Sequence, residues 1–252
     1  MGRLARPGDF FDFTRYRPMI RLVEGKREID LPNSVINYAR GDDGTDFMFF
    51  HLQEPHAFGE DYAESVLEVF KYFGIKRYSR LGAMYDTVPH TKPILVTGST
   101  GDVPTKGNTG NLLRQPSRYQ GPTSIMNLVS DGVAKLNLDV DIMNFMVHLP
   151  QYVQIDEDYA GVARLLEVLA SIYDLPEDLF PRERAERQYR ELDKAAETNP
   201  ELGPLIQRME SWYDAQVAGE DEQSESETKL SPEVEDFLEE MDQRFGEAEQ
   251  PD

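Results

Sequence analysis

The stretch GAMYDTVPHTKPILVTGSTGD, Gly82 to Asp102, contains the pattern that decides the fold. Its first residues end one predicted strand, Lys76–Tyr85, and a Pro-His-Thr turn then leads to a second predicted strand, Pro93–Gly98. A Gly-Ser-Thr-Gly loop follows that strand directly. Short apolar strands that are separated by turns rich in proline and glycine indicate a layered domain built around a sheet.

The Gly-Ser-Thr-Gly loop invites comparison with nucleotide-binding sequences. A strand that runs into Gly98 and Gly101 is how a dinucleotide-binding fold begins, but Pro104 stands where the third glycine should allow a helix to pack closely. A phosphate-binding P-loop is excluded as well, because Lys106 precedes Gly107 and no Gly-Lys-Ser/Thr sequence occurs. We therefore expect an ordinary loop and no cofactor.

Outward from this stretch, predicted strands and helices alternate along the chain. Asp46–Glu54 is a nearly continuous apolar run, which is typical of a strand buried on both faces of a parallel sheet. Asp141–Pro150 is a further strand, and 3.6-residue periodicity predicts helices over Gly59–Phe73, Thr123–Leu136 and Glu157–Tyr173. The alternation predicts an α/β fold of three layers, with a mainly parallel sheet between helices. Near the N-terminus, alternating apolar residues around the turn VEGKRE predict a β-hairpin.

Charge and composition exclude several classes of function. The chain of 252 residues has a formal net charge of −21, so it repels nucleic acids and anionic membranes. It contains no cysteine, which excludes disulfides, thiolate nucleophiles and cysteine-ligated metals. No segment is apolar for long enough to span a membrane, and we expect a cytoplasmic protein.

Composition also divides the chain. We expect an α/β domain over residues 1–178, a helical extension over 179–217, an acidic linker over 218–230 and an amphipathic docking helix over 231–246. Residues 218–252 hold 14 acidic residues against two basic ones. The linker lacks the large apolar residues that would offset its ordering entropy. The predicted helix has a partner-binding stripe of Val234, Phe237, Leu238, Met241 and Phe245.

Three histidines follow predicted strands, namely His56, His90 and His148. The carboxyl ends of parallel strands line one crevice, so these side chains and Glu54 could converge as a metal site or as a general acid/base set. The alternative is that each histidine is a structural residue with its ring hydrogen-bonded locally. The absence of a paired spacing such as His-x-x-x-His favours this alternative.

Gly121 and Pro122 precede the helix predicted from Thr123, whose first turn offers free backbone N–H groups for an anion. Ser124 lies in that turn, but it lacks the Gly-x-Ser-x-Gly context of a hydrolase nucleophile. We expect Ser124 to be a capping residue, with Gly121 on the rim of the same crevice.

The turn VPHTKP, the later segments GPTSIMNLVSDGVAKLNLDV and FMVHLPQYV, and the helix ARLLEVLASIYDL resemble the PAC2 family, which is named for a proteasome assembly chaperone. Pro89, His90, Thr91 and Pro93 are the most specific part of the resemblance. It implies a phosphorylase/hydrolase-like α/β fold, an oligomer and no established reaction. Members commonly begin with a further strand and helix, and this chain is expected to start after that element.

Two hypotheses follow. The resemblance favours a non-enzymatic interaction or assembly-chaperone-like protein, with protein partners, self-association and no cofactor or metal. The strand-end histidines, Glu54 and the anion-ready helix favour a small-molecule hydrolase or phosphorylase whose crevice includes Thr91. A stably bound protein would favour the first hypothesis, and a small molecule in the crevice would favour the second.

Overall fold

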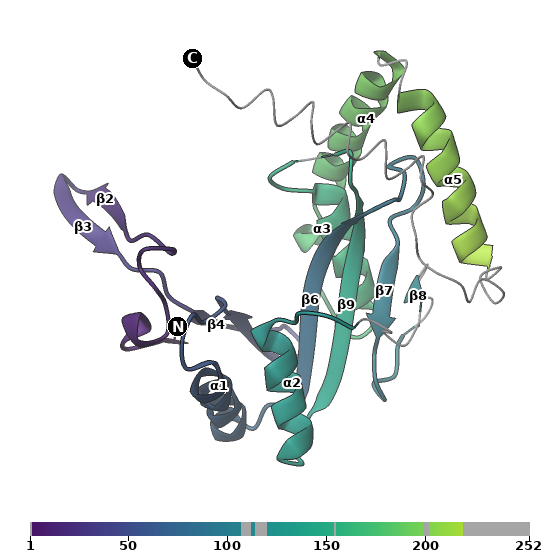
Figure 1. Cartoon of the computed structure of the whole chain (residues 1–252). Helices are drawn as coiled ribbons and strands as arrows, with labels where there is room; N and C mark the ends of the chain where they lie inside the picture. Colours follow the sequence, from purple (N-terminus) through teal and green to yellow (C-terminus); the bar gives the residue numbers. More distant parts are fainter. Residues whose placement is uncertain (1, 107–111, 114–119, 154, 199–201, 219–252) are drawn as a thin grey trace. The chain divides into compact units, whose positions relative to one another are not determined.

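The computed structural model describes residues 2–106, 112–113, 120–153, 155–198 and 202–218 (Figure 1). Its strands are β1 (Gly2–Arg3), β2 (Met19–Val23), β3 (Lys26–Asp30), β4 (Val35–Arg40), β5 (Asp46–His51), β6 (Arg77–Asp86), β7 (Val96–Ser99), β8 (Leu112–Leu113) and β9 (Asp141–Pro150). Its helices are α1 (Gly59–Phe73), α2 (Ile125–Lys135), α3 (Tyr159–Ala170), α4 (Arg182–Thr198) and α5 (Leu202–Ala218), with 3₁₀ turns at Pro7–Asp9 and Glu177–Leu179. The chain divides into two compact units, Met1–Glu210 and Ser211–Asp252.

The fold mixes helices and sheets as predicted, but the expected single, mainly parallel sheet is wrong. A four-stranded sheet has the order β6-β9-β7-β8, in which β6 is parallel to β9 and β7 is antiparallel to β9. Of the four strands predicted to share one sheet, β5 lies elsewhere, in an antiparallel sheet of order β1-β4-β5. The prediction failed because strand direction depends on the partner strand, and the partner of β5 was not recognised.

That partner is β4, which joins β5 through a tight turn. The Gly41 N–H donates to the Thr45 carbonyl oxygen (2.7 Å), and the Asp43 carboxylate accepts from both the N–H and the hydroxyl of Thr45. A connection this short can only join antiparallel strands, since a parallel crossover needs a dozen or more residues. The apolar composition of β5 therefore indicates that its side chains are packed, whereas the short turn to β4 determines that the two strands are antiparallel.

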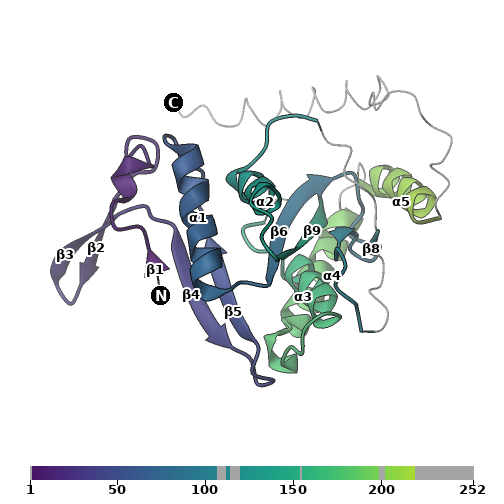
Figure 2. The same ribbon diagram turned by 90° about the horizontal axis from the view of Figure 1, so that it is seen from below.

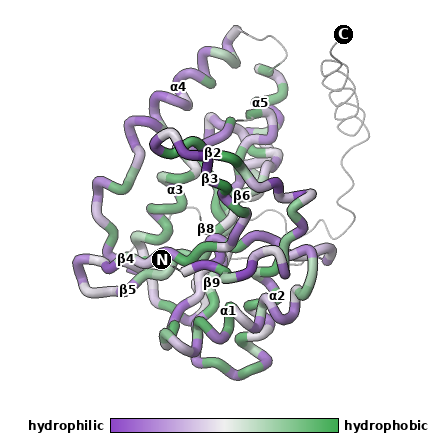
Figure 3. The backbone as a smooth tube through the Cα atoms, turned by 90° about the vertical axis from the view of Figure 1, so that its left-hand side faces the viewer, coloured by the Kyte–Doolittle hydropathy of each residue, from purple (hydrophilic) through white to green (hydrophobic). Residues whose placement is uncertain are grey.

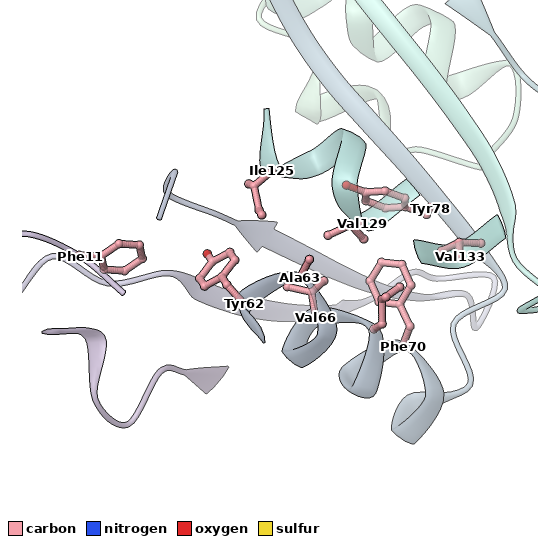
Figure 4. Packing of buried hydrophobic residues seen from close by; sticks show 10 residues of the cluster. Phe11, Tyr62, Ala63, Val66, Phe70, Tyr78, Ile125, Val129 and Val133 are labelled. Carbon is pink, nitrogen blue, oxygen red and sulfur yellow. The ribbon is translucent and has the colours of Figure 1, made fainter. Parts of the chain in front are cut away.

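Helices pack against both faces of the β6–β9 pair. Successive side chains of a strand point to opposite faces. On one face Met143, Phe145 and Val147 of β9 pack with Val168 of α3. On the other face Tyr78 of β6 joins a cluster with α1 and α2 (Figure 4).

Helices α1 and α2 cross closely in that second layer. Helix α1 has the bounds that its periodicity predicted, and Gly74 ends it in a left-handed conformation with φ of 62°. Gly132 of α2 faces α1, and a Cβ atom there would lie 2.4 Å from Leu67 Cδ1. The small residue at position 132 therefore lets the two helices approach.

The predicted hairpin is confirmed as the pair β2–β3. Its two-residue turn, Glu24 and Gly25, has φ values of 51° and 78°, as a type I′ turn requires. Every residue of both strands is exposed. Figure 2 shows the hairpin standing clear of α1 and β4.

Among the described residues, no helix combines the length and the apolar character needed to cross a membrane. The predicted acidic linker, apart from Ala218, and the predicted docking helix with its apolar stripe lie outside the described residues.

Candidate functional site

The Pro-His-Thr turn holds His90 in the interior, where its side chain is only 1% exposed. The Tyr152 hydroxyl accepts the backbone N–H of His90 (2.8 Å) and lies 2.6 Å from His90 Nδ1. His90 Nε2 lies 3.2 Å from Asp193 Oδ1 of α4, but without the alignment of a hydrogen bond. The ring edges of Tyr152 and Tyr189 complete the surroundings of the imidazole.

These contacts favour one assignment of donors and acceptors at the imidazole. The Tyr152 hydroxyl accepts the backbone N–H of His90, so its own proton is available to donate to Nδ1. In the neutral imidazole, Nε2 then carries the proton and faces the carboxylate of Asp193. Burial raises the pKa of Tyr152 to about 12, so this hydroxyl keeps its proton at neutral pH. The group acts as a fixed hydrogen-bond partner of the turn.

Further bonds tie the same region to the helices. Thr91 Oγ1 donates to Glu210 Oε1 of α5 (2.5 Å), and the Tyr189 hydroxyl of α4 donates to Asp158 Oδ2 (3.1 Å). Asp158 also caps α3 by accepting from the Gly161 N–H (2.7 Å). The turn thus contacts Tyr189 and Asp193 of α4 and Glu210 of α5.

Glu54 contacts the start of α2. Both carboxylate oxygens of Glu54 accept from the Ile125 N–H, at 3.0 and 3.1 Å. The chain's own anion therefore occupies the anion site that the sequence predicted after Gly121. Ser124 is the N-cap residue of α2, but its side chain makes no capping hydrogen bond, and Glu54 is the side chain that accepts from the first N–H of the helix.

His148 lies at the centre of a hydrogen-bonded line across three strands. Its Nδ1 lies 2.6 Å from Asp86 Oδ2 at the end of β6, and its Nε2 lies 2.8 Å from Thr97 Oγ1 of β7. Burial alone would raise the pKa of Asp86, but hydrogen bonds from His148 and from the Thr87 N–H outweigh it and hold that pKa below its ordinary value. A carboxylate, an imidazole and a hydroxyl in this order are the parts of a general-base relay.

Asp86 and Thr97 were missed from the sequence, although a signal for Asp86 was available. The strand-end position that singles out His148 on β9 also applies to Asp86, which ends β6, the parallel neighbour of β9. Applying the same rule to carboxylates would have paired the two residues. Thr97 offers no such signal, because it lies inside a short strand.

His56 lies apart from the other candidate histidines and packs against the N-terminal segment. Its Nδ1 accepts the Asp12 N–H (3.2 Å), and its ring packs edge-on against Tyr16. His56 borders a hollow of about 540 Å³, together with Arg15 and residues 8–12. This hollow is open and polar, and it contains neither His90 nor Glu54.

The first glycine of the Gly-Ser-Thr-Gly loop, Gly98, is required by the close packing of the neighbouring strand. A Cβ atom at Gly98 would lie 2.0 Å from the Asn144 carbonyl oxygen of the neighbouring strand. Gly101, with φ of 58°, then turns the chain beside a second hollow of about 390 Å³ lined mainly by residues 133–142. The glycines thus allow close packing of β7 on β9.

The sequence-predicted residues fall into four local groups. They are Glu54 with Gly121 and Ser124, His56 alone, His90 with Thr91, and His148 alone. Among the described residues, no hydrogen bond or ion pair joins one group to another, and no three potential ligands lie together as a metal site needs. One crevice shared by all of them stays a prediction.

The chain is similar to one protein family and to several solved structures. The model of the PAC2 family matches residues 6–196, and no curated protein sequence matches. Three similar solved structures show the fold. A PAC2 family protein from Streptomyces avermitilis is 23% identical, with a TM-score of 0.65 over 82% of this chain and 86% of that chain. A proteasome-assembly chaperone homologue from Mycobacterium tuberculosis is 22% identical, with a TM-score of 0.67 over 82% and 86%. The archaeal proteasome activator PbaB from Pyrococcus furiosus is 15% identical, with a TM-score of 0.54 over 71% and 77%.

Proposed function

The chain belongs to the PAC2 family, and from this membership we propose that it is a non-enzymatic interaction protein of the assembly-chaperone kind. It acts in the cytoplasm, associates with itself and binds protein partners. Proteasome subunits are the first partners to test, because two similar structures are described as a proteasome-assembly chaperone homologue and a proteasome activator.

The observation that carries the proposal is the exposed edge of the four-stranded sheet. Among the described residues, β6 is an edge strand of that sheet and presents Leu81, Met84 and Tyr85 to solvent. An open strand edge offers unpaired backbone groups to another chain, and exposed apolar side chains add the area that stabilises such pairing. In contrast, His90 is buried, and the carboxylate of Glu54 is bonded to the start of α2.

The test is binding of purified proteasome core subunits from the organism that encodes the chain. The double variant Leu81→Glu/Tyr85→Glu places two like charges on the edge and is expected to lose the bound subunit. The control Leu179→Glu charges an exposed leucine outside that strand and is expected to retain it. Equal capture by all three proteins would refute the edge as the binding surface.

A second candidate function is a hydrolase, favoured by the Thr97–His148–Asp86 line alone. In that function Thr97 Oγ1 is the nucleophile, His148 Nε2 takes its proton, and Asp86 orients the imidazole. Incubation with p-nitrophenyl acetate would leave an acetyl group on Thr97, which mass spectrometry of peptides detects. If no acetyl group is found on Thr97, this role is excluded. It is also excluded if the Thr97→Val variant is acetylated, at a different residue, to the same extent as the wild type.

A further inference from the structure

The β2–β3 hairpin has one apolar face and one charged face. The register pairs Ile20 with Ile29 and Leu22 with Arg27, so these four side chains share one face. On the other face Arg21 lies opposite Glu28 and forms an ion pair with Asp30 (3.3 Å). Arg21 and Asp30 on this face are therefore paired within the hairpin, whereas the aliphatic side chains of the first face need a partner surface.

The apolar face has no cover within the described residues. Ile20, Leu22 and Ile29 are 65%, 74% and 68% exposed. A two-stranded hairpin without further packing is marginally stable in water, and clustered exposed aliphatic side chains mark an interaction surface. Figure 3 shows the apolar stretch of the hairpin beside the hydrophilic residues of the same turn region.

Charge selects the kind of surface that fits. Residues 15–30 hold five basic and three acidic residues, a net charge of +2 in a chain whose total is −21. Two such hairpins facing one another would bring like charges together. An acidic surface suits the hairpin better, and a second copy of this chain supplies one.

Helix α1 carries an acidic surface that fits this requirement. Glu60, Glu64, Glu68 and Tyr72 follow at intervals of four residues and thus lie along one face of the helix. All four are exposed, and Tyr72 is 82% exposed. Carboxylates can face Arg27 and the other basic residues of the hairpin, while the tyrosine ring can cover its aliphatic side chains.

From this match we propose that the β2–β3 hairpin is an exchange arm that docks its apolar face on α1 of a second copy. The inference rests on the self-association proposed above and assigns its surface. A two-fold arrangement lets each copy give its hairpin and receive the other, so one dimer contains the contact twice.

Sedimentation equilibrium of the full chain at micromolar concentration tests the arm. The wild type is expected at a multiple of 28.8 kDa. The variant Ile20→Ser/Leu22→Ser/Ile29→Ser is expected at 28.8 kDa, with a dissociation constant raised at least about tenfold. The matched control Met19→Ser/Val23→Ser removes exposed apolar side chains from the opposite face and is expected to keep the oligomer. Melting curves by circular dichroism check that all three chains fold alike.

Cross-linking tests the receiving helix, because the chain contains no natural cysteine. A Leu22→Cys chain mixed with a Tyr72→Cys chain is expected to give a cross-linked pair with a short bismaleimide, whereas Val23→Cys with Tyr72→Cys is expected to give none. A monomeric wild type would overturn both the self-association and the arm. An oligomer that survives the triple serine change would overturn the arm alone, and equal yields from both cysteine pairs would overturn docking on α1.

Discussion

His90 and Tyr152 are joined twice, through the backbone N–H of His90 and through its Nδ1, both within 2.8 Å of one tyrosine hydroxyl. The residues are 62 positions apart, so the pair ties the Pro-His-Thr turn to the segment after β9. A histidine in the most specific motif of the chain therefore serves the fold, because its side chain is closed off from solvent.

The Tyr152→Phe variant is expected to lose about 1–3 kcal/mol of unfolding free energy, since a buried N–H and a ring nitrogen lose their shared partner. Urea unfolding followed by circular dichroism measures the change. The control Tyr159→Phe removes an exposed hydroxyl that bonds Glu157, and it is expected to cost less than about 0.5 kcal/mol. Equal losses in the two variants would contradict the proposed role of the turn.

Glu54→Gln is expected to destabilise the protein by about 0.5–2 kcal/mol, because the start of α2 loses a charged acceptor at the positive end of the helix. The control Glu191→Gln changes an exposed carboxylate within α4 and is expected to be nearly neutral. Chemical denaturation at neutral pH compares the two. Should Glu54→Gln unfold at the wild-type urea midpoint, the capping role assigned to Glu54 is wrong.

Asp86 predicts a specific dependence of stability on pH. Its pKa in the folded protein lies below the ordinary value of 3.8, so its ionised form contributes stability that is present above pH 3.8. That contribution is lost as the pH falls through the lower, folded-state pKa. Unfolding free energies of the wild type and of Asp86→Asn should therefore differ at neutral pH and converge below pH 3.8. A difference that stays constant or grows on acidification would contradict this sign.

Gly98→Ala is expected to cost about 1–3 kcal/mol or more, since the added methyl group meets the Asn144 carbonyl oxygen, a backbone atom that cannot rotate away. Gly203→Ala is the matched control, because no atom lies within 4 Å of the position that its methyl group would take. Thermal unfolding of both variants gives the comparison. A Gly98→Ala protein as stable as the wild type would show that β7 can shift away from β9.

Local patterns predicted the local structure well. The bounds of α1 followed from its apolar periodicity and from Gly74, and the β2–β3 hairpin followed from the turn at Gly25. Sheet membership was harder, because β5 could be assigned only after β4, a short strand that we had not recognised. The direction of β7 also depends on its pairing with β9, which no local pattern encodes.

The sequence predicted individual residues of the candidate site where a local pattern marks them, but it did not predict their contacts with distant residues. The strand-end rule brought His148 to attention, but its partner Thr97 lies 51 positions away on a short strand. Glu54 bonds Ile125 across 71 positions, a direct contact that the sequence pattern does not specify. Such long-range contacts depend on the folded arrangement and leave no periodic trace in the sequence.

Sedimentation velocity of the full chain, titrated with purified proteasome core subunits, tests the proposed interaction role most directly. We expect a faster-sedimenting complex of the chain and a subunit at micromolar concentration, formed by the wild type and by Leu179→Glu but lost in Leu81→Glu/Tyr85→Glu. If the chain and every subunit sediment independently at all ratios, the proposal of an assembly-chaperone-like protein with proteasome partners is wrong.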